Sequence, residues 1–108
     1  MNLEEISIVA MEIIAYAGNA KSCYMNALKQ YKQKAMQKGN EYFQSGDKAM
    51  LIAHKSHHKL LTKEMNEQQP QISLLLAHAE DQLMNTETIK ILVEEMKEIY
   101  ISGGKNNE

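Results

Sequence analysis

Apolar and small residues recur at alternating intervals of three and four along the first third of the chain. The row consists of Leu3, Ile6, Ala10, Ile13, Ala17, Ala20, Tyr24, Ala27 and Tyr31. Such spacing over four heptads is typical of a coiled-coil seam. Asn2 can cap the first turn, and Glu5 completes a capping box. We therefore predict a long packed helix, in which Gly18 marks a close helix contact.

The pattern is interrupted between residues 34 and 47, where Gly39-Asn40 is the best turn candidate. A second helix is then predicted to run to about Met65. Its expected inward residues are Met50, Ala53, His57, Leu60 and Leu61. The polar residues 66–70 end in the only proline of the chain, and proline fits at or just before a helix start. They therefore predict a connection to a further helix.

The third helix is predicted from Gln71 or Ile72 to about Ile101, with residues 102–108 as a frayed tail. Its expected seam contains Leu75, His78, Gln82, Asn85, Ile89, Leu92, Met96 and Ile99. Three long helices joined by short links predict an all-α fold, an antiparallel three-helix bundle formed by a single domain of residues 1–108.

The first half of this third seam is polar, because His78, Gln82 and Asn85 replace apolar residues and Asp81 lies three residues from His78. Buried polar groups are unfavourable unless they are paired or serve a purpose. Polar seam residues can fix register and oligomeric state, and a lone histidine there is more often a packing residue. Alternatively, His78 is a nucleophile or ligand, with Asp81 as its orienting group or as a metal ligand.

A second group of histidines, His54, His57 and His58, lies on the predicted second helix. His54 and His58 are four residues apart and project from one face, a spacing that can hold zinc. No glutamate lies between them, so the usual metalloprotease pattern is absent. Surface exposure or packing between helices is the default interpretation of all three.

Composition and charge narrow the function classes further. The chain has 108 residues, a formal net charge of −2 and one cysteine, Cys23. No apolar run is long enough to span a membrane, and no secretory signal is recognisable. We expect a cytoplasmic protein that does not bind nucleic acid. The local basic stretch is expected to be a solvated helix face, since its one interleaved aromatic residue, Tyr31, belongs to the apolar seam; the stretch contains Lys29, Lys32, Lys34 and Lys38.

Three motifs along the chain carry a resemblance to a known family. Residues 15–22, Ala-Tyr-Ala-Gly-Asn-Ala-Lys-Ser, are followed by Asn-Ala-Leu at 26–28, and Ala53-His54 lies in the second helix. Residues 74–84 read Leu-Leu-Leu-Ala-His-Ala-Glu-Asp-Gln-Leu-Met. Together they resemble the signatures of the lactose/cellobiose-specific enzyme IIA family of the phosphoenolpyruvate-dependent sugar phosphotransferase system. The resemblance covers about residues 2–100.

The resemblance implies a phosphohistidine carrier. His78 would accept phosphate from the histidine-containing phosphocarrier protein and pass it to a cysteine of a IIB component. The IIC permease, the chain's only link to the membrane, would couple this to uptake of a β-disaccharide such as cellobiose, chitobiose or lactose. Gln82 would support the phosphate. The family assembles as a homotrimer, a nine-helix cluster, in which the copies of Asp81 would share a divalent cation, with Mg²⁺ expected.

The chain also departs from the family pattern. Glu80 replaces a glutamine, Gln82 replaces a histidine, and His57-His58 stand where the family has Gln-Thr. Residues 34–36 replace the usual Gly-Asp-Phe turn, so we expect the first turn to be displaced toward Gly39. These departures motivate an alternative hypothesis, a non-catalytic regulatory or scaffolding bundle derived from this family.

Overall fold

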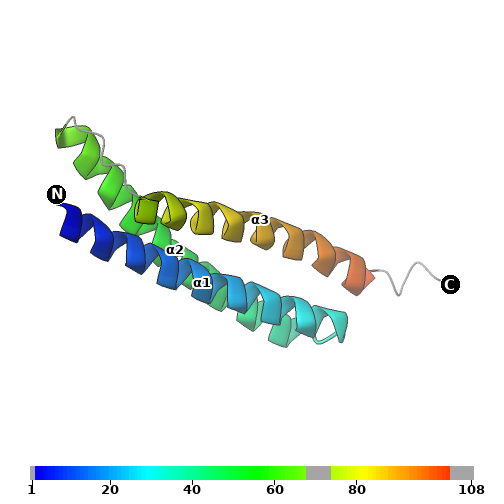
Figure 1. The fold of residues 1–108 in the computed structure, drawn as a ribbon. Helices are drawn as coiled ribbons and strands as arrows, with labels where there is room; N and C mark the ends of the chain where they lie inside the picture. Colours follow the sequence, from blue (N-terminus) through cyan, green and yellow to red (C-terminus); the bar gives the residue numbers. More distant parts are fainter. Residues whose placement is uncertain (1, 68–73, 103–108) are drawn as a thin grey trace.

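Three helices account for the part of the chain that the computed structural model describes, residues 2–67 and 74–102. α1 spans Leu3–Lys32, α2 Met36–Glu67 and α3 Leu74–Ser102. They form an elongated antiparallel bundle of 61 × 20 × 18 Å (Figure 1). The predicted all-α three-helix fold is confirmed. Within the described ranges, no helix is both long and apolar enough to cross a bilayer.

Some boundaries differ from the predicted ones. α2 continues two residues beyond Met65, so the predicted connection at 66–70 begins inside a helix. The rest of that connection, the predicted start of the third helix at Gln71 or Ile72, and residues 103–108 of the predicted tail all lie outside the described residues.

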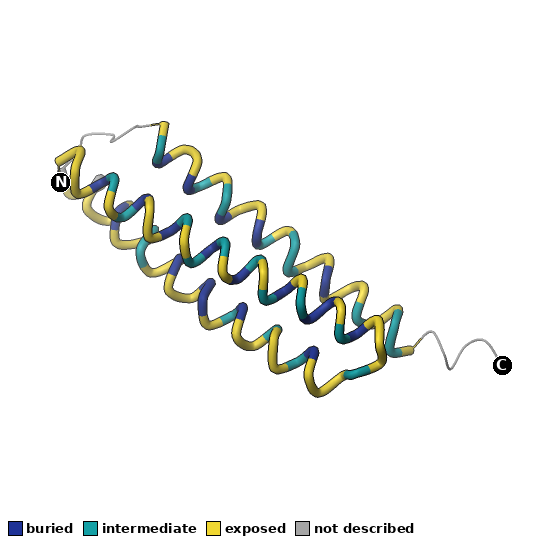
Figure 2. The backbone as a smooth tube through the Cα atoms, turned by 60° about the horizontal axis from the view of Figure 1, so that its bottom comes forward, coloured by how far each residue is buried: buried dark blue, intermediate teal, exposed yellow. Residues whose placement is uncertain are grey.

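The predicted seam of α1 is buried along nearly its whole length. Only Leu3 is exposed, and every other member of the row is in the core. The Asn2 cap is also confirmed, since the Glu5 amide donates to Asn2 Oδ1 at 2.8 Å. Both other helices pack mainly on α1 and touch each other at few points; Figure 2 shows the buried positions as a stripe along each helix. The expected close contact at Gly18 is wrong, because no atom of another side chain or helix lies within 4 Å of a Cβ built there.

The first turn lies at residues 33–35, and the prediction of a turn at Gly39-Asn40 is wrong. Lys34 adopts a φ of 64°, the left-handed conformation that glycine usually supplies at a helix end. Its amide donates to Tyr31 O at 2.9 Å, and its ammonium donates to the Tyr100 carbonyl near the end of α3. A lysine therefore closes the turn without the displacement that the missing glycine suggested.

Gly39 and Gly46 are contact points between α2 and α1. A Cβ added to Gly39 would lie 2.3 Å from the Tyr31 ring, and one added to Gly46 would lie 2.7 Å from the Tyr24 ring. The Tyr31 hydroxyl also donates to Asn40 Oδ1 at 2.7 Å. The two tyrosines are seven residues apart, as are the two glycines, so the same contact repeats along the antiparallel pair.

The Tyr24 hydroxyl links α1 to both other helices. It donates to Asp47 Oδ1 at 2.6 Å, and the same carboxylate oxygen lies 3.0 Å from Lys90 Nζ on α3. Burial raises the pKa of the Tyr24 phenol far above its ordinary value, and the hydrogen bond and charge of Asp47 raise it further. The phenol therefore remains a hydrogen-bond donor throughout the neutral range.

Candidate functional site

α3 turns a different row toward the bundle interior from the predicted one. Its buried residues are Leu76, Ala79, Leu83, Thr86 and Val93. In the predicted row, which begins one residue earlier, three residues are half-buried, namely Leu75, Gln82 and Ile89. The others are exposed, namely His78, Asn85, Leu92, Met96 and Ile99. The predicted seam of α3 is therefore wrong, and that row lies at the edge of the core of a single chain.

Polar residues in the true inward row account for the error. Thr86 is fully buried, and its hydroxyl lies 2.8 Å from Gln82 O and 3.2 Å from Ala17 O. Lys90 and Lys97 place their ammonium groups 5.8 and 5.4 Å from the centroids of aromatic rings on α2 and α1. These three residues lie in the inward row because each finds a partner there for its polar end. A search for apolar residues alone therefore favoured the row that begins one residue earlier.

His78 is exposed on the surface of α3. Its imidazole has no hydrogen bond or ion pair with any other residue in the described ranges. Asp81 and Gln82 follow at three and four residues and share its side of the helix, the first exposed and the second half-buried. The interpretation of His78 as a packing residue inside the bundle is therefore wrong for the single chain. An exposed imidazole with uncommitted nitrogens can act as a nucleophile.

Glu80, the acidic departure nearest His78, points away from it. Residues two apart on an α-helix are separated by about 200° around the axis. The Glu80 carboxylate is directed at α2, where Oε2 lies 2.8 Å from His57 Nε2. Its charge is therefore held on the opposite side of α3 from the candidate nucleophile.

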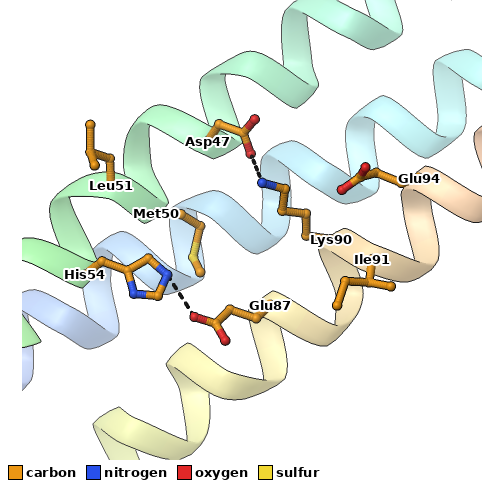
Figure 3. Close-up of a pocket in the computed structure, with 8 residues that line it drawn as sticks. All are labelled: Asp47, Met50, Leu51, His54, Glu87, Lys90, Ile91 and Glu94. Atoms are coloured by element: carbon orange, nitrogen blue, oxygen red, sulfur yellow. Dashed lines mark ion pairs between the residues drawn. The ribbon is translucent and has the colours of Figure 1, made fainter.

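A second histidine–carboxylate pair joins the same two helices. His54 Nε2 lies 2.8 Å from Glu87 Oε1, at one end of a groove of about 640 Å³ between α2 and α3 (Figure 3). Lys90 and Asp47 pair farther along this groove. Sequence reasoning missed both histidine–carboxylate pairs, since their only signal was complementary charge on two helices of unknown register.

The histidines of α2 do not assemble a metal site with their neighbours. His54 and His57 each face a carboxylate of α3, and His58 is exposed. Within the described residues, no three His, Cys, Asp or Glu side chains are grouped to hold a metal ion. Cys23 is half-buried on α1, with Sγ 3.7 Å from Asn19 Oδ1.

Comparison with known proteins identifies the family. Residues 8–101 match the family described as PTS system, Lactose/Cellobiose specific IIA subunit. The lactose-specific EIIA component of Streptococcus mutans serotype c is 34% identical over 103 residues, 95% of this chain and 99% of that protein. The oligo-beta-mannoside-specific EIIA component of Bacillus subtilis is 33% identical over 92 residues, 85% of this chain and 84% of that protein.

A solved structure agrees with these relatives. The crystal structure of the PTS cellobiose-specific enzyme IIA from Bacillus anthracis superposes with a TM-score of 0.89 at 31% identity, over 99% of this chain and 96% of that one. Sequence and fold therefore agree over nearly the whole length. The chain belongs to the lactose/cellobiose-specific IIA subunit family of the phosphotransferase system.

Proposed function

We propose that this chain is a cytoplasmic phosphocarrier that accepts phosphate on His78 from the histidine-containing phosphocarrier protein and passes it to a IIB component. The transfer would drive uptake of a β-disaccharide such as cellobiose, chitobiose or lactose. The observation that supports this most directly is the exposure of His78 within the family motif at residues 74–84. Two proteins must reach the same imidazole in turn, and an open helix surface allows both to do so.

The chemistry is a nucleophilic displacement at phosphorus. An imidazole nitrogen of His78 forms a new N–P bond as the N–P bond of the donor phosphohistidine breaks, and the donor imidazole leaves with its electron pair. In the second step a IIB thiolate attacks the phosphorus and forms an S–P bond as the N–P bond to His78 breaks, and the imidazole leaves with its electron pair. The Gln82 amide lies one turn from His78 and can donate a hydrogen bond to a phosphoryl oxygen, as a histidine would at that position.

Phosphate acceptance is testable with purified components. Incubation with phosphoenolpyruvate, enzyme I and the phosphocarrier protein is expected to add one acid-labile phosphoryl group per chain, measured by intact mass before and after mild acid. The matched control omits only the phosphocarrier protein and should show no transfer. A chain that stays unmodified in the complete mixture would contradict the proposal and favour the regulatory or scaffolding alternative.

The homotrimer is part of this proposal. α3 exposes large apolar residues beyond His78 that the bundle does not cover: Ile91 is 60% exposed, Leu92 50% and Ile99 65%. Leu92 and Ile99 are seven residues apart and share one side of α3, and apolar side chains grouped on a water-exposed helix face are typical of an association site. α3 packs its inward row against the bundle and exposes apolar side chains on this outer row as well, as a helix that packs on two sides requires.

A shared divalent cation would involve Asp81. Its carboxylate is exposed, and oxygen ligands of this kind suit Mg²⁺. The described part of one chain does not gather enough ligands around it, so the donor set fits a cation only when several copies meet. A cation held by three copies would neutralise carboxylates that otherwise repel one another.

Sedimentation can test the trimer, and metal analysis of the purified protein can test the bound ion. We expect three times the 12.3 kDa mass of one chain at micromolar concentration, with one Mg²⁺ or Mn²⁺ bound per three chains. Leu92→Glu with Ile99→Glu should give a monomer, because six buried charges would face one another in the trimer. Asp81→Asn should abolish ion binding. A wild-type monomer would contradict the trimer, and unchanged ion binding by Asp81→Asn would contradict the role of this residue.

A further inference from the structure

Positive charge is concentrated on one stretch of α2. Residues 48–63 contain four lysines and three histidines and no aspartate or glutamate, in a chain whose formal net charge is −2. The lysines are Lys48, Lys55, Lys59 and Lys63, and all four are exposed. None of them forms an ion pair with a residue of the described ranges. Their charge is therefore available to an external anion.

The four lysines form one row along the outer side of α2, which we call the lysine face. Successive members are seven, four and four residues apart, so at about 100° per residue they stay within about 80° of one another. Fifteen residues of helix separate the first from the last, a length of about 22 Å.

The surface between these lysines is hollowed and partly apolar. A shallow depression of about 650 Å³ is lined by Lys55, Lys59 and Lys63 together with His58. Ile52, one turn from Lys48 along the row, is itself 39% exposed. Long lysine side chains can extend beyond such apolar surface and place their ammonium groups among phosphates while their methylene stems stay in contact with it.

We propose that the lysine face docks the protein on the anionic phospholipid headgroups of a membrane surface. Rows of four or more lysines on one side of a helix are attracted to anionic leaflets. The chain contains lysine as its only strongly basic residue type and has no arginine. Lysine is a flexible point charge that suits many mobile phosphates, whereas recognition of specific carboxylates on a protein favours the bidentate guanidinium. The observations therefore favour a lipid surface over an acidic protein.

Docking of this kind leaves the phosphate-accepting site open. Glu80 points from α3 toward α2, and His78 lies about 200° away from it around the axis of α3. The nucleophile therefore does not share the lysine face. If the proposed function holds, surface docking would raise the local concentration of the carrier near membrane-bound components. The docking itself needs no phosphate transfer and can fail or succeed independently.

Vesicle flotation tests the proposal. At low salt the wild-type chain should float with phosphatidylcholine vesicles that contain 30 mol% phosphatidylglycerol, remain unbound with pure phosphatidylcholine, and be released by about 0.5 M NaCl because salt screens the attraction. Lys55→Gln, Lys59→Gln and Lys63→Gln combined should weaken binding by about tenfold or more. These residues are exposed, so circular dichroism should report an intact helical fold.

A matched variant separates the lysine face from net charge alone. Lys29→Gln, Lys32→Gln and Lys38→Gln remove three exposed lysines near the first turn and change the net charge equally. This variant should retain vesicle binding within about twofold. Absence of wild-type binding to the anionic vesicles would overturn the proposal. This holds even if the lysine face binds an acidic protein instead of a membrane. Equal losses in the two triple variants would overturn it as well.

Discussion

Replacing His78 with alanine is expected to abolish phosphate acceptance and leave the bundle as stable as the wild-type chain. The imidazole is the nucleophile in the proposed transfer, so its removal leaves no atom to form the N–P bond. The side chain is exposed and makes no hydrogen bond or ion pair with another residue of the described ranges that folding would lose. Exposed substitutions of this kind change the free energy of unfolding by about 0.5 kcal/mol or less. Intact mass and thermal unfolding would measure the two effects.

Histidine controls make this result specific. His58→Gln removes an exposed imidazole from α2 and should still acquire one phosphoryl group per chain at the wild-type rate. His57→Gln should behave in the same way, since amide donors can replace the contact to Glu80. A His78→Ala chain that still gains an acid-labile phosphate would refute the assignment. If only the His58→Gln chain failed to acquire phosphate, the phosphate acceptor would be His58 on α2.

The sequence predicted α1 better than α3, and the difference has a physical cause. The inward row of α1 consists of aliphatic, alanine and tyrosine side chains, so its periodicity has one solution. α3 carries two neighbouring rows, and the inward one includes Thr86, Lys90 and Lys97. Each of these satisfies its polar end on the backbone or near an aromatic ring. Burial of such polar residues depends on partners from other helices, and periodicity within a single segment does not reveal these partners.

The site was predictable only in part for the same reason. Spacing brought His78, Asp81 and Gln82 to one side of a helix, and the structure agrees. Spacing also placed them in the interior of the bundle, and only the packing of α3 on α1 showed that this side is exposed. The orientation of Glu80 toward His57 required the register between α2 and α3. These cross-helix contacts explain how the chain carries an extra acidic residue near the motif without directing it at His78.

A close helix contact was predicted at Gly18, whereas the structure has one at Gly46, and alanine substitutions would separate the two positions. Gly46→Ala is expected to lower stability, because its Cβ would lie 2.7 Å from the ring of Tyr24, which is itself fully buried. Overpacking of this kind costs about 1–3 kcal/mol. Alanine regains about 1 kcal/mol of helix propensity, so the net loss is about 0–2 kcal/mol. The Cβ of Gly18→Ala would meet no side chain and no other helix within 4 Å, and this variant should instead raise stability by up to about 1 kcal/mol.

Urea unfolding at one fixed protein concentration would measure both variants, since self-association makes stability depend on concentration. The cause of the loss can be isolated with Tyr24→Leu, which removes the ring atoms that the new Cβ would meet. In that background Gly46→Ala should cost less than in the wild type, a coupling that a double-mutant cycle detects. An equal cost in both backgrounds would show that the ring is not what excludes a side chain at Gly46. If Gly46→Ala raised the free energy of unfolding, the close contact between α1 and α2 at this position would be contradicted.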